Sequence, residues 1–104
     1  MQKNELLSDL KARLEAVFRA RLAAVILFGS EARGEAGPES DIDILVLLHG
    51  ALELPGDVRA AIHAVYPVTL ATGRPVNPHV VEARESEPFD CPLSRTIRRE
   101  GLVA

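Results

Sequence analysis

The stretch GSEARGEAGPESDID, residues 29–43, lies between two apolar runs, RLAAVILF (residues 21–28) and ILVLL (residues 44–48). A continuous apolar run of this length that ends at a glycine favours a strand covered on both faces. Two aspartates, Asp41 and Asp43, open the second run. Burial of an unpaired carboxylate costs several kcal/mol of folding free energy. Two carboxylates at the start of a strand therefore predict a hydrogen-bonding partner or a bound metal ion.

The remaining chain predicts helices and strands in alternation around these two runs. The expected elements are a helix over 4–19 with Asn4 as its N-cap, a strand over 22–28, a short helical turn from Ser30, a strand over 41–48, a helix over 56–73, a strand over 74–84 and a helix over 90–101. Pro67 is expected to kink or end the third of these helical segments, and Pro78 restricts the last strand to a sheet edge or a bulge. The order predicts one α/β (α+β) domain, residues 1–104, with a small mixed β-sheet flanked by helices.

Composition excludes several classes of function. A formal net charge of -3 argues against nucleic acid as a partner, since binding it usually requires a basic face. The charged amino terminus is unlike a signal peptide, and no apolar stretch reaches the ~20 residues of a membrane span. Cys91 is the only cysteine, so neither a disulfide nor a thiolate zinc site is expected. The chain is expected to be cytoplasmic, with no membrane partner.

The spacing of the two aspartates predicts a site for a hard cation. Residues two apart on a strand point to the same face, about 6.6 Å apart along the backbone. Asp41 and Asp43 can therefore converge on Mg²⁺, or on Mn²⁺ in its place, together with substrate phosphates. Gly29 allows a sharp turn and a close backbone approach, and Ser30 offers a hydroxyl and an N–H that suit a phosphate oxygen.

The same stretch resembles the signature of the DNA polymerase β-like nucleotidyltransferase superfamily, which is Gly-Ser, ten residues, then Asp-x-Asp. The surrounding ILFGSEARGEAGPESDIDILV (residues 26–46) is similar to its minimal, single-domain members, among them the antitoxins of HEPN-type toxins. The resemblance implies that a nucleoside monophosphate moves from a triphosphate, most simply ATP, to an acceptor, with release of pyrophosphate.

The resemblance also implies roles for individual residues. Asp41 and Asp43 are the catalytic, metal-holding pair, while Gly29 and Ser30 bind the triphosphate. Ser40 belongs to the expected nucleotide-binding set, and so does Arg33, for which an ordinary surface position is the alternative. The implied protein partner is a helical HEPN-type toxin, with a homo-oligomer as the alternative source of an acceptor pocket.

One part of the family pattern is missing. Active members carry a third carboxylate on the next core strand, but PVNPHVV (residues 75–81) contains neither Asp nor Glu. Asn77 and His79 share one face of that strand, and Glu82 stands at its end. His79 and Glu82 are the candidate substitutes for the third acid, with an ordinary strand-edge histidine as the alternative for His79.

The gap leaves two functions open. The first is a Mg²⁺-dependent nucleotidyltransferase that modifies a protein or small-molecule acceptor. The second is a catalytically weak or inactive module that binds a nucleotide or a protein partner. Loss of a general base typically lowers a rate by ~10²–10⁴, so both remain possible outcomes of the same site.

Overall fold

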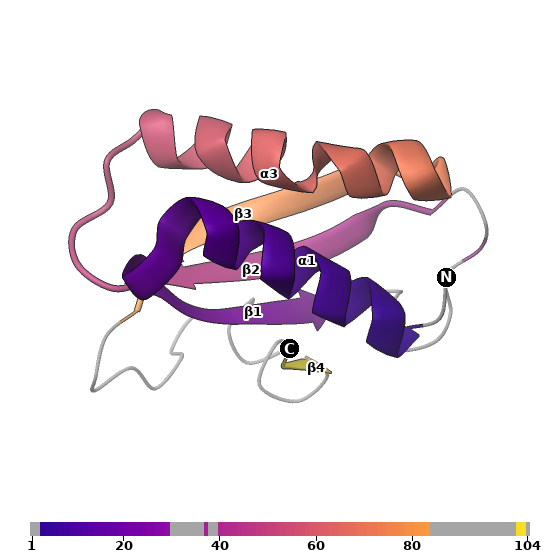
Figure 1. Cartoon of the computed structure of the whole chain (residues 1–104), viewed down its shortest axis with the longest axis horizontal. Helices are drawn as coiled ribbons and strands as arrows, with labels where there is room; N and C mark the ends of the chain where they lie inside the picture. Colours follow the sequence, from indigo (N-terminus) through magenta and orange to yellow (C-terminus); the bar gives the residue numbers. More distant parts are fainter. Residues whose placement is uncertain (1–2, 30–36, 38–39, 84–101, 104) are drawn as a thin grey trace.

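The two central strands pair side by side in a small mixed sheet. The computed structural model describes residues 3–29, 37, 40–83 and 102–103. The strands are β1 (Leu22–Phe28), β2 (Ile42–Leu48), β3 (Val76–Glu82) and β4 (Leu102–Val103), in the order β3-β2-β1-β4. β1 runs antiparallel to β2 and β4, whereas β2 and β3 are parallel. The predicted mixed sheet is confirmed (Figure 1).

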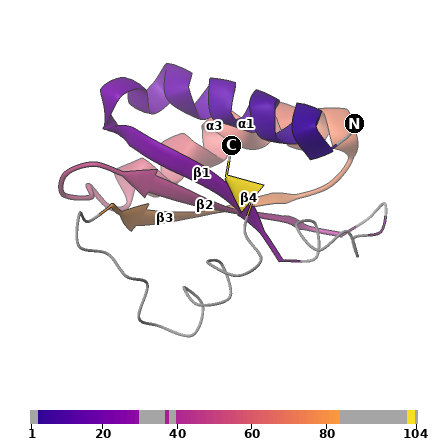
Figure 2. The ribbon, with the colours of Figure 1, turned by 90° about the horizontal axis from the view of Figure 1, so that it is seen from below.

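Two helices cover one face of this sheet: α1 (Lys3–Phe18) and α3 (Gly56–Thr72). Figure 2 shows both helices on the same side of the strands. Between the two layers lies the main core, formed by Leu6, Leu7, Leu10, Leu14, Phe18, Val25, Leu27, Ile42, Ile44, Val46, Leu48, Ala61, Val65 and Val68. The leucines of α1 recur at steps of three and four, so they fall on the face that the sheet buries.

Successive side chains of β1 and β2 point to opposite faces of the sheet, so the face away from the helices carries a different set of side chains. Ile26, Phe28, Leu45 and Leu47 form a second, smaller buried cluster there. Because side chains on a strand alternate between faces, the odd-numbered positions of β2 belong to this face. Asp43 therefore lies on the side of the sheet away from the helices.

The first helix begins and ends slightly earlier than predicted. Asn4 was the expected N-cap, but the helix already includes Lys3, so Asn4 lies within the first turn. The carboxyl end has a clear backbone cause, since Arg19 adopts φ +52°, a conformation that cannot continue an α-helix. A short 3₁₀ turn, η1 (Arg19–Arg21), then leads into β1.

Pro67 does not end α3. The helix continues past it to Thr72 and stops at Gly73, which takes φ +71° and donates its N–H to the carbonyl of Thr69 at 2.8 Å. A glycine in the left-handed conformation is a common helix terminator. The helical periodicity on both sides of Pro67, together with burial of Val65 and Val68 against the sheet, outweighs the local cost of the proline.

An ion pair fastens η1 to the start of α3. Arg21 donates from Nη1 and Nη2 to the two carboxylate oxygens of Asp57 at 3.0 and 2.8 Å, and the N–H of Glu53 donates to Oδ2 at 2.8 Å. Asp57 is only 5% exposed. The hydrogen bonds from Arg21, and then that from Glu53, hold the pKa of Asp57 below its ordinary value. The pair ties the amino-terminal helix segment to the second half of the fold.

The edge position of β3 agrees with the prediction from Pro78, because an edge strand has one side on which a missing N–H costs no ladder bond. The short strand β4 was not predicted. The expected helical turn from Ser30 and the expected helix over 90–101 lie outside the described residues. Within the described part of the chain, no helix combines the length and apolar character needed to cross a membrane.

Candidate functional site

The two aspartates lie at the amino end of β2, on the face that the helices leave uncovered. Asp41 directly precedes the strand and is exposed, while Asp43 is its second residue and has a side chain 32% exposed. The alternation of β2 puts both on one face, since Ile42 and Ile44 between and after them point into the main core. Both carboxylates therefore reach solvent from a strand whose other face is anchored.

Gly29 lies beside this pair. The antiparallel register sets Phe28 opposite Asp43, so the end of β1 meets the start of β2. Gly29 turns the chain with φ +76°, and a Cβ built on it would lie 2.9 Å from Oδ2 of Asp43. Only glycine satisfies both the backbone conformation and the close approach.

Asn77 completes the group from the neighbouring strand. The parallel register pairs Asn77 with Asp43. Its Nδ2 donates to Oδ2 of Asp41 at 3.2 Å and to Oδ1 of Asp43 at 3.3 Å. One amide nitrogen thus lies where oxygens of both carboxylates converge. Sequence reasoning noted Asn77 as a neutral residue in place of an acid but did not assign it to the site, because the register of β3 against β2 is a long-range property.

His79 and Glu82 have different positions. His79 lies on the same face as Asn77, with Nε2 3.9 Å from Oδ1 of Asp43 and its ring 5.4 Å from that of Phe28. Glu82 pairs with Leu48 at the opposite end of the sheet. Five residues along a strand correspond to roughly 16 Å, and the odd spacing from Asn77 turns Glu82 to the other face. The structure therefore places Glu82 away from the aspartate pair, whereas His79 borders it.

Hydrogen bonds within the loop before β2, and from that loop to the residues before β3, hold the backbone around Asp41. The Ser40 Oγ accepts from the N–H of Gly37 at 2.9 Å, and the Ser40 carbonyl accepts from Nε of Arg74 at 2.8 Å. The N–H of Ile42 donates to the carbonyl of Pro75 at 2.8 Å. These contacts fix the backbone on each side of Asp41. Ser30 and Arg33, the other expected nucleotide-binding residues, lie outside the described residues.

The carboxylate oxygens of Asp41 and Asp43 are suitable ligands for one hard cation. Two carboxylate oxygens already converge on a single polar hydrogen donor, and an oxygen-rich, solvent-facing pair is what Mg²⁺ or Mn²⁺ prefers. No metal-binding group of three or more His, Cys, Asp or Glu side chains occurs within the described ranges. Asp41 and Asp43 would therefore hold the ion, with the remaining positions left for water and phosphate oxygens.

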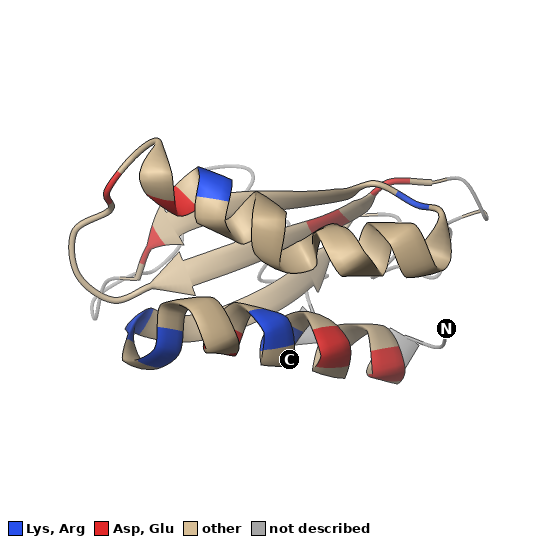
Figure 3. Ribbon diagram, turned by 45° about the horizontal axis from the view of Figure 1, so that its top comes forward, with Lys and Arg blue, Asp and Glu red and all other residues tan. Residues whose placement is uncertain are grey.

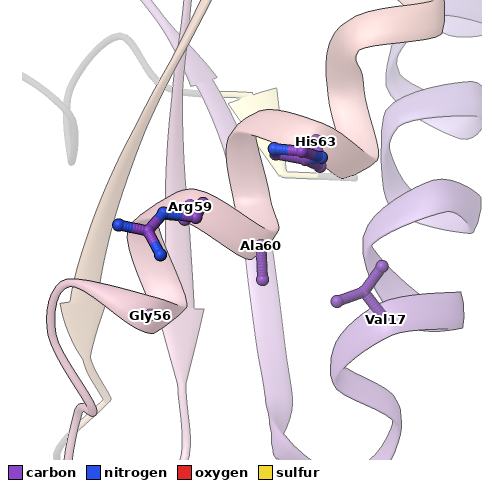
Figure 4. Close-up of a pocket in the computed structure, with 5 residues that line it drawn as sticks. All are labelled: Val17, Gly56, Arg59, Ala60 and His63. Carbon is purple, nitrogen blue, oxygen red and sulfur yellow. The ribbon is translucent and has the colours of Figure 1, made fainter.

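The hollows of the helical layer lie away from these acids. One, of about 490 Å³, is lined by Val17, Gly56, Arg59, Ala60 and His63 between α1 and α3 (Figure 4). Another, of about 290 Å³, is lined by Ile62, His63 and Tyr66. Figure 3 shows that α3 carries charge only near its amino end, so most of this outer surface is uncharged. The sheet separates both hollows from Asp41 and Asp43.

The described residues form a two-layer α+β fold with a pair of carboxylates at the amino end of β2, beside the Gly29 turn that ends β1. Residues 4–104 match the model of the nucleotidyltransferase domain. The chain belongs to the nucleotidyltransferase-domain family, as the Gly-Ser and Asp-x-Asp spacing indicated.

Two proteins of Methanocaldococcus jannaschii, each named a "putative protein adenylyltransferase", are similar in sequence. MJ0604 is 40% identical over 105 residues, which cover 99% of this chain and 98% of that protein. MJ0141 is 40% identical over 48 residues, which cover 46% of this chain and 48% of that protein. This chain thus aligns with nearly all of one relative and about half of the other.

Three solved structures of toxin–antitoxin proteins share the fold. A chain from the structure of a mutant MntA–HpeT toxin–antitoxin has a TM-score of 0.61 at 20% identity, over 99% of this chain and 72% of that chain. A chain from the structure of a toxin–antitoxin with AMP-PNP has a TM-score of 0.60 at 23% identity. The match covers 91% of this chain and 69% of that chain. A tri-AMPylated Shewanella oneidensis HEPN toxin with its MNT antitoxin has a TM-score of 0.52 at 21% identity, over 96% and 66%. At these identities the likeness is one of fold.

Proposed function

We propose that this protein is an adenylyltransferase that moves AMP from ATP to an acceptor, with a protein as the favoured acceptor class. The observation that carries the proposal is the convergence of Asp41 and Asp43 on one point beside the Gly29 turn. Family membership and the names of the two archaeal relatives support the same chemistry.

The bound cation, Mg²⁺ or Mn²⁺, would neutralise phosphate charge and favour departure of pyrophosphate. Asp41 and Asp43 would hold it at the mouth of β2, and Gly29 would let the triphosphate approach the backbone. Ser30, Ser40 and Arg33 stay in the proposed nucleotide-binding set.

The proposed transfer of AMP involves no change of oxidation state. An acceptor oxygen attacks the α-phosphorus of ATP, the bond from that phosphorus to the β-phosphate bridging oxygen breaks, and pyrophosphate leaves. Asn77, which faces the aspartate pair from β3, is not a base, so the acceptor proton passes to solvent or to the imidazole of His79, which borders the pair. This arrangement predicts slow turnover rather than none.

The proposed biological setting is a toxin–antitoxin pair. A helical HEPN-type partner would receive AMP, as the toxin in one of the structural neighbours is AMPylated. Under this proposal the partner also provides the acceptor surface, since the two hollows lined by described residues lie on the helical layer, away from the acids.

A partner-binding module with little or no turnover is the second candidate. The neutral Asn77 opposite Asp43 favours it, because a third carboxylate would otherwise help to activate the acceptor. The two candidates share nucleotide binding and differ in whether AMP is transferred.

Transfer of label separates the two. The purified protein is incubated with Mg²⁺ and ATP labelled at the α-phosphate, alone and with a co-expressed helical protein encoded beside it. Labelled protein that disappears in D41N and D43N variants, and persists in a D9N control on α1, supports the transferase. Absence of label with every partner, while the wild type and both variants still bind that partner, refutes transfer and favours the module.

A further inference from the structure

The side chain of Asn77 stands between two like charges. Its Nδ2 is 3.2 Å from an oxygen of Asp41 and 3.3 Å from an oxygen of Asp43. The other polar side chain recorded near the pair, within the described ranges, is His79, at 3.9 Å from Asp43. Among the described residues, the neutral amide of Asn77 thus donates a hydrogen bond to each carboxylate, which offsets part of the repulsion between them.

The position of Asn77 follows from the sheet and not from chance packing at a surface. β3 is parallel to β2, and its register pairs Asn77 with Asp43 and His79 with Leu45. The backbone beside Asp41 is held by the hydrogen bond from Ile42 to Pro75, just before β3. Amide and carboxylates are thus fixed on two bonded strands, which gives a site better defined than one built on loops.

An asparagine amide can serve two states of such a site. Its NH₂ group is a donor and its carbonyl oxygen is an acceptor, and a half-turn of the amide exchanges the two. The NH₂ group suits the free carboxylates, and the oxygen is a neutral ligand that hard cations accept. An aspartate at the same place would serve only the second state and would add a third negative charge to the first.

We infer that Asn77 is the third member of the cation-binding shell: its amide holds Asp41 and Asp43 together when no cation is bound and presents its oxygen when one is. The inference rests on the proposed nucleotidyltransferase function for its choice of cation. It assigns to Asn77 the place that the sequence offered to His79 or Glu82. When no nucleotide is bound, the two negative charges of the carboxylates neutralise the charge of one divalent cation, and the amide adds no charge.

Mn²⁺ alone is the probe, because its free-ion electron paramagnetic resonance signal reports binding without nucleotide, acceptor or turnover. Wild type is compared with N77A, N77D and the matched control E82Q, which alters a side chain at the far end of the same strand. Thermal unfolding of each variant with and without Mn²⁺ provides the second measurement.

The expected result is graded. N77A binds Mn²⁺ about tenfold more weakly and loses most of the rise in Tm that Mn²⁺ produces, on the scale typical of groups around a metal. N77D binds about tenfold more tightly, since ligand charge raises affinity, and it has a lower Tm than wild type when no metal is present. E82Q matches wild type in its Mn²⁺ affinity and in the rise in Tm that Mn²⁺ produces.

Three outcomes overturn the inference. One is Mn²⁺ affinity in N77A and N77D equal to that of wild type. Another is a loss of Tm in N77A that is the same with and without Mn²⁺, which a purely structural residue would produce. The third is an effect of E82Q on Mn²⁺ affinity as large as that of N77A. Should N77A fail to fold, N77D against wild type still decides.

The inference and the proposed function fail separately. Wild-type protein that transfers no AMP, yet binds Mn²⁺ in a manner sensitive to Asn77, would remove the transferase and leave the cation shell. Protein that transfers AMP while its Mn²⁺ affinity is indifferent to Asn77 would do the reverse.

Discussion

A Cβ on Gly29 would lie 2.9 Å from Oδ2 of Asp43, so the turn after β1 and the carboxylate on β2 occupy adjoining space with no room between them. The two residues belong to strands that pair antiparallel, with Phe28 opposite Asp43. The turn that the family signature places ahead of the acids is thereby in direct contact with one of them.

The first prediction concerns this contact. Gly29→Ala should lower the free energy of unfolding by about 1–2 kcal/mol, because alanine is strained at φ +76°. It should also weaken Mn²⁺ binding, because the added Cβ would displace the carboxylate of Asp43. Gly50→Ala is the matched control, since Gly50 has φ +81° and nothing within 4 Å of its built Cβ. Gly50→Ala should lose similar stability in urea unfolding and bind Mn²⁺ normally; equal Mn²⁺ binding by both variants would contradict the prediction.

The second prediction concerns the ion pair between Arg21 and Asp57. Asp57→Ala removes the acceptor of the Glu53 N–H and of both Arg21 nitrogens. We expect the free energy of unfolding at pH 7 to fall by about 1–3 kcal/mol, as for loss of hydrogen bonds to a charged group. Urea denaturation followed by circular dichroism measures it. Asp9→Asn, which removes the charge from a partly exposed i,i+4 pair with Arg13, should change stability by less than about 0.5 kcal/mol.

The same pair predicts a pH dependence. The pKa of Asp57 is lower in the folded state than its ordinary value of 3.8, first because Arg21 donates hydrogen bonds to it and second because Glu53 does. Its stabilising contribution is therefore fully present above the unfolded pKa and is lost as the pH falls through the folded pKa. The gap in stability between wild type and Asp57→Asn should be constant from pH 7 to pH 5 and should narrow below pH ~4. A gap that widens in acid would contradict the assignment.

The third feature to test is the proline within α3. The helix continues from Gly56 to Thr72 although Pro67 lacks the N–H that an internal helical position normally donates. Pro67→Ala should therefore raise the free energy of unfolding, by about 1–3 kcal/mol. Thermal and urea unfolding measure the change. A loss of stability would mean that packing of the proline ring outweighs its cost to the helix.

The outer surface of α3 provides a contrast between buried and exposed apolar residues. Ile62, Tyr66 and Leu70 are 47%, 55% and 67% exposed, whereas Val65 is 1% exposed. Ile62→Gln and Leu70→Gln should each change stability by less than about 0.5 kcal/mol, while Val65→Ala should cost about 2 kcal/mol. Equal losses from Ile62→Gln and Val65→Ala in urea unfolding would show that the outer surface is buried in solution.

The sequence by itself determined those features that depend on near neighbours. The three- and four-residue recurrence of leucines predicted α1, and the two apolar runs predicted β1 and β2, because local periodicity decides which face is buried. The common face of Asp41 and Asp43 followed from the two-residue repeat of a strand. Pro78 indicated an edge strand because of its missing N–H.

Only the tertiary structure decided what lies across from these residues. Pairing of Asn77 with Asp43, and of Glu82 with Leu48, depends on the register between two strands separated by the whole of α3. A shift of one residue in that register would exchange the faces of β3, and no local pattern excludes it. Continuation of α3 through Pro67 likewise depends on burial against the sheet. Thus the sequence alone was sufficient to identify the pair of acids, Asp41 and Asp43. Only the fold showed that the neutral amide of Asn77 lies between them.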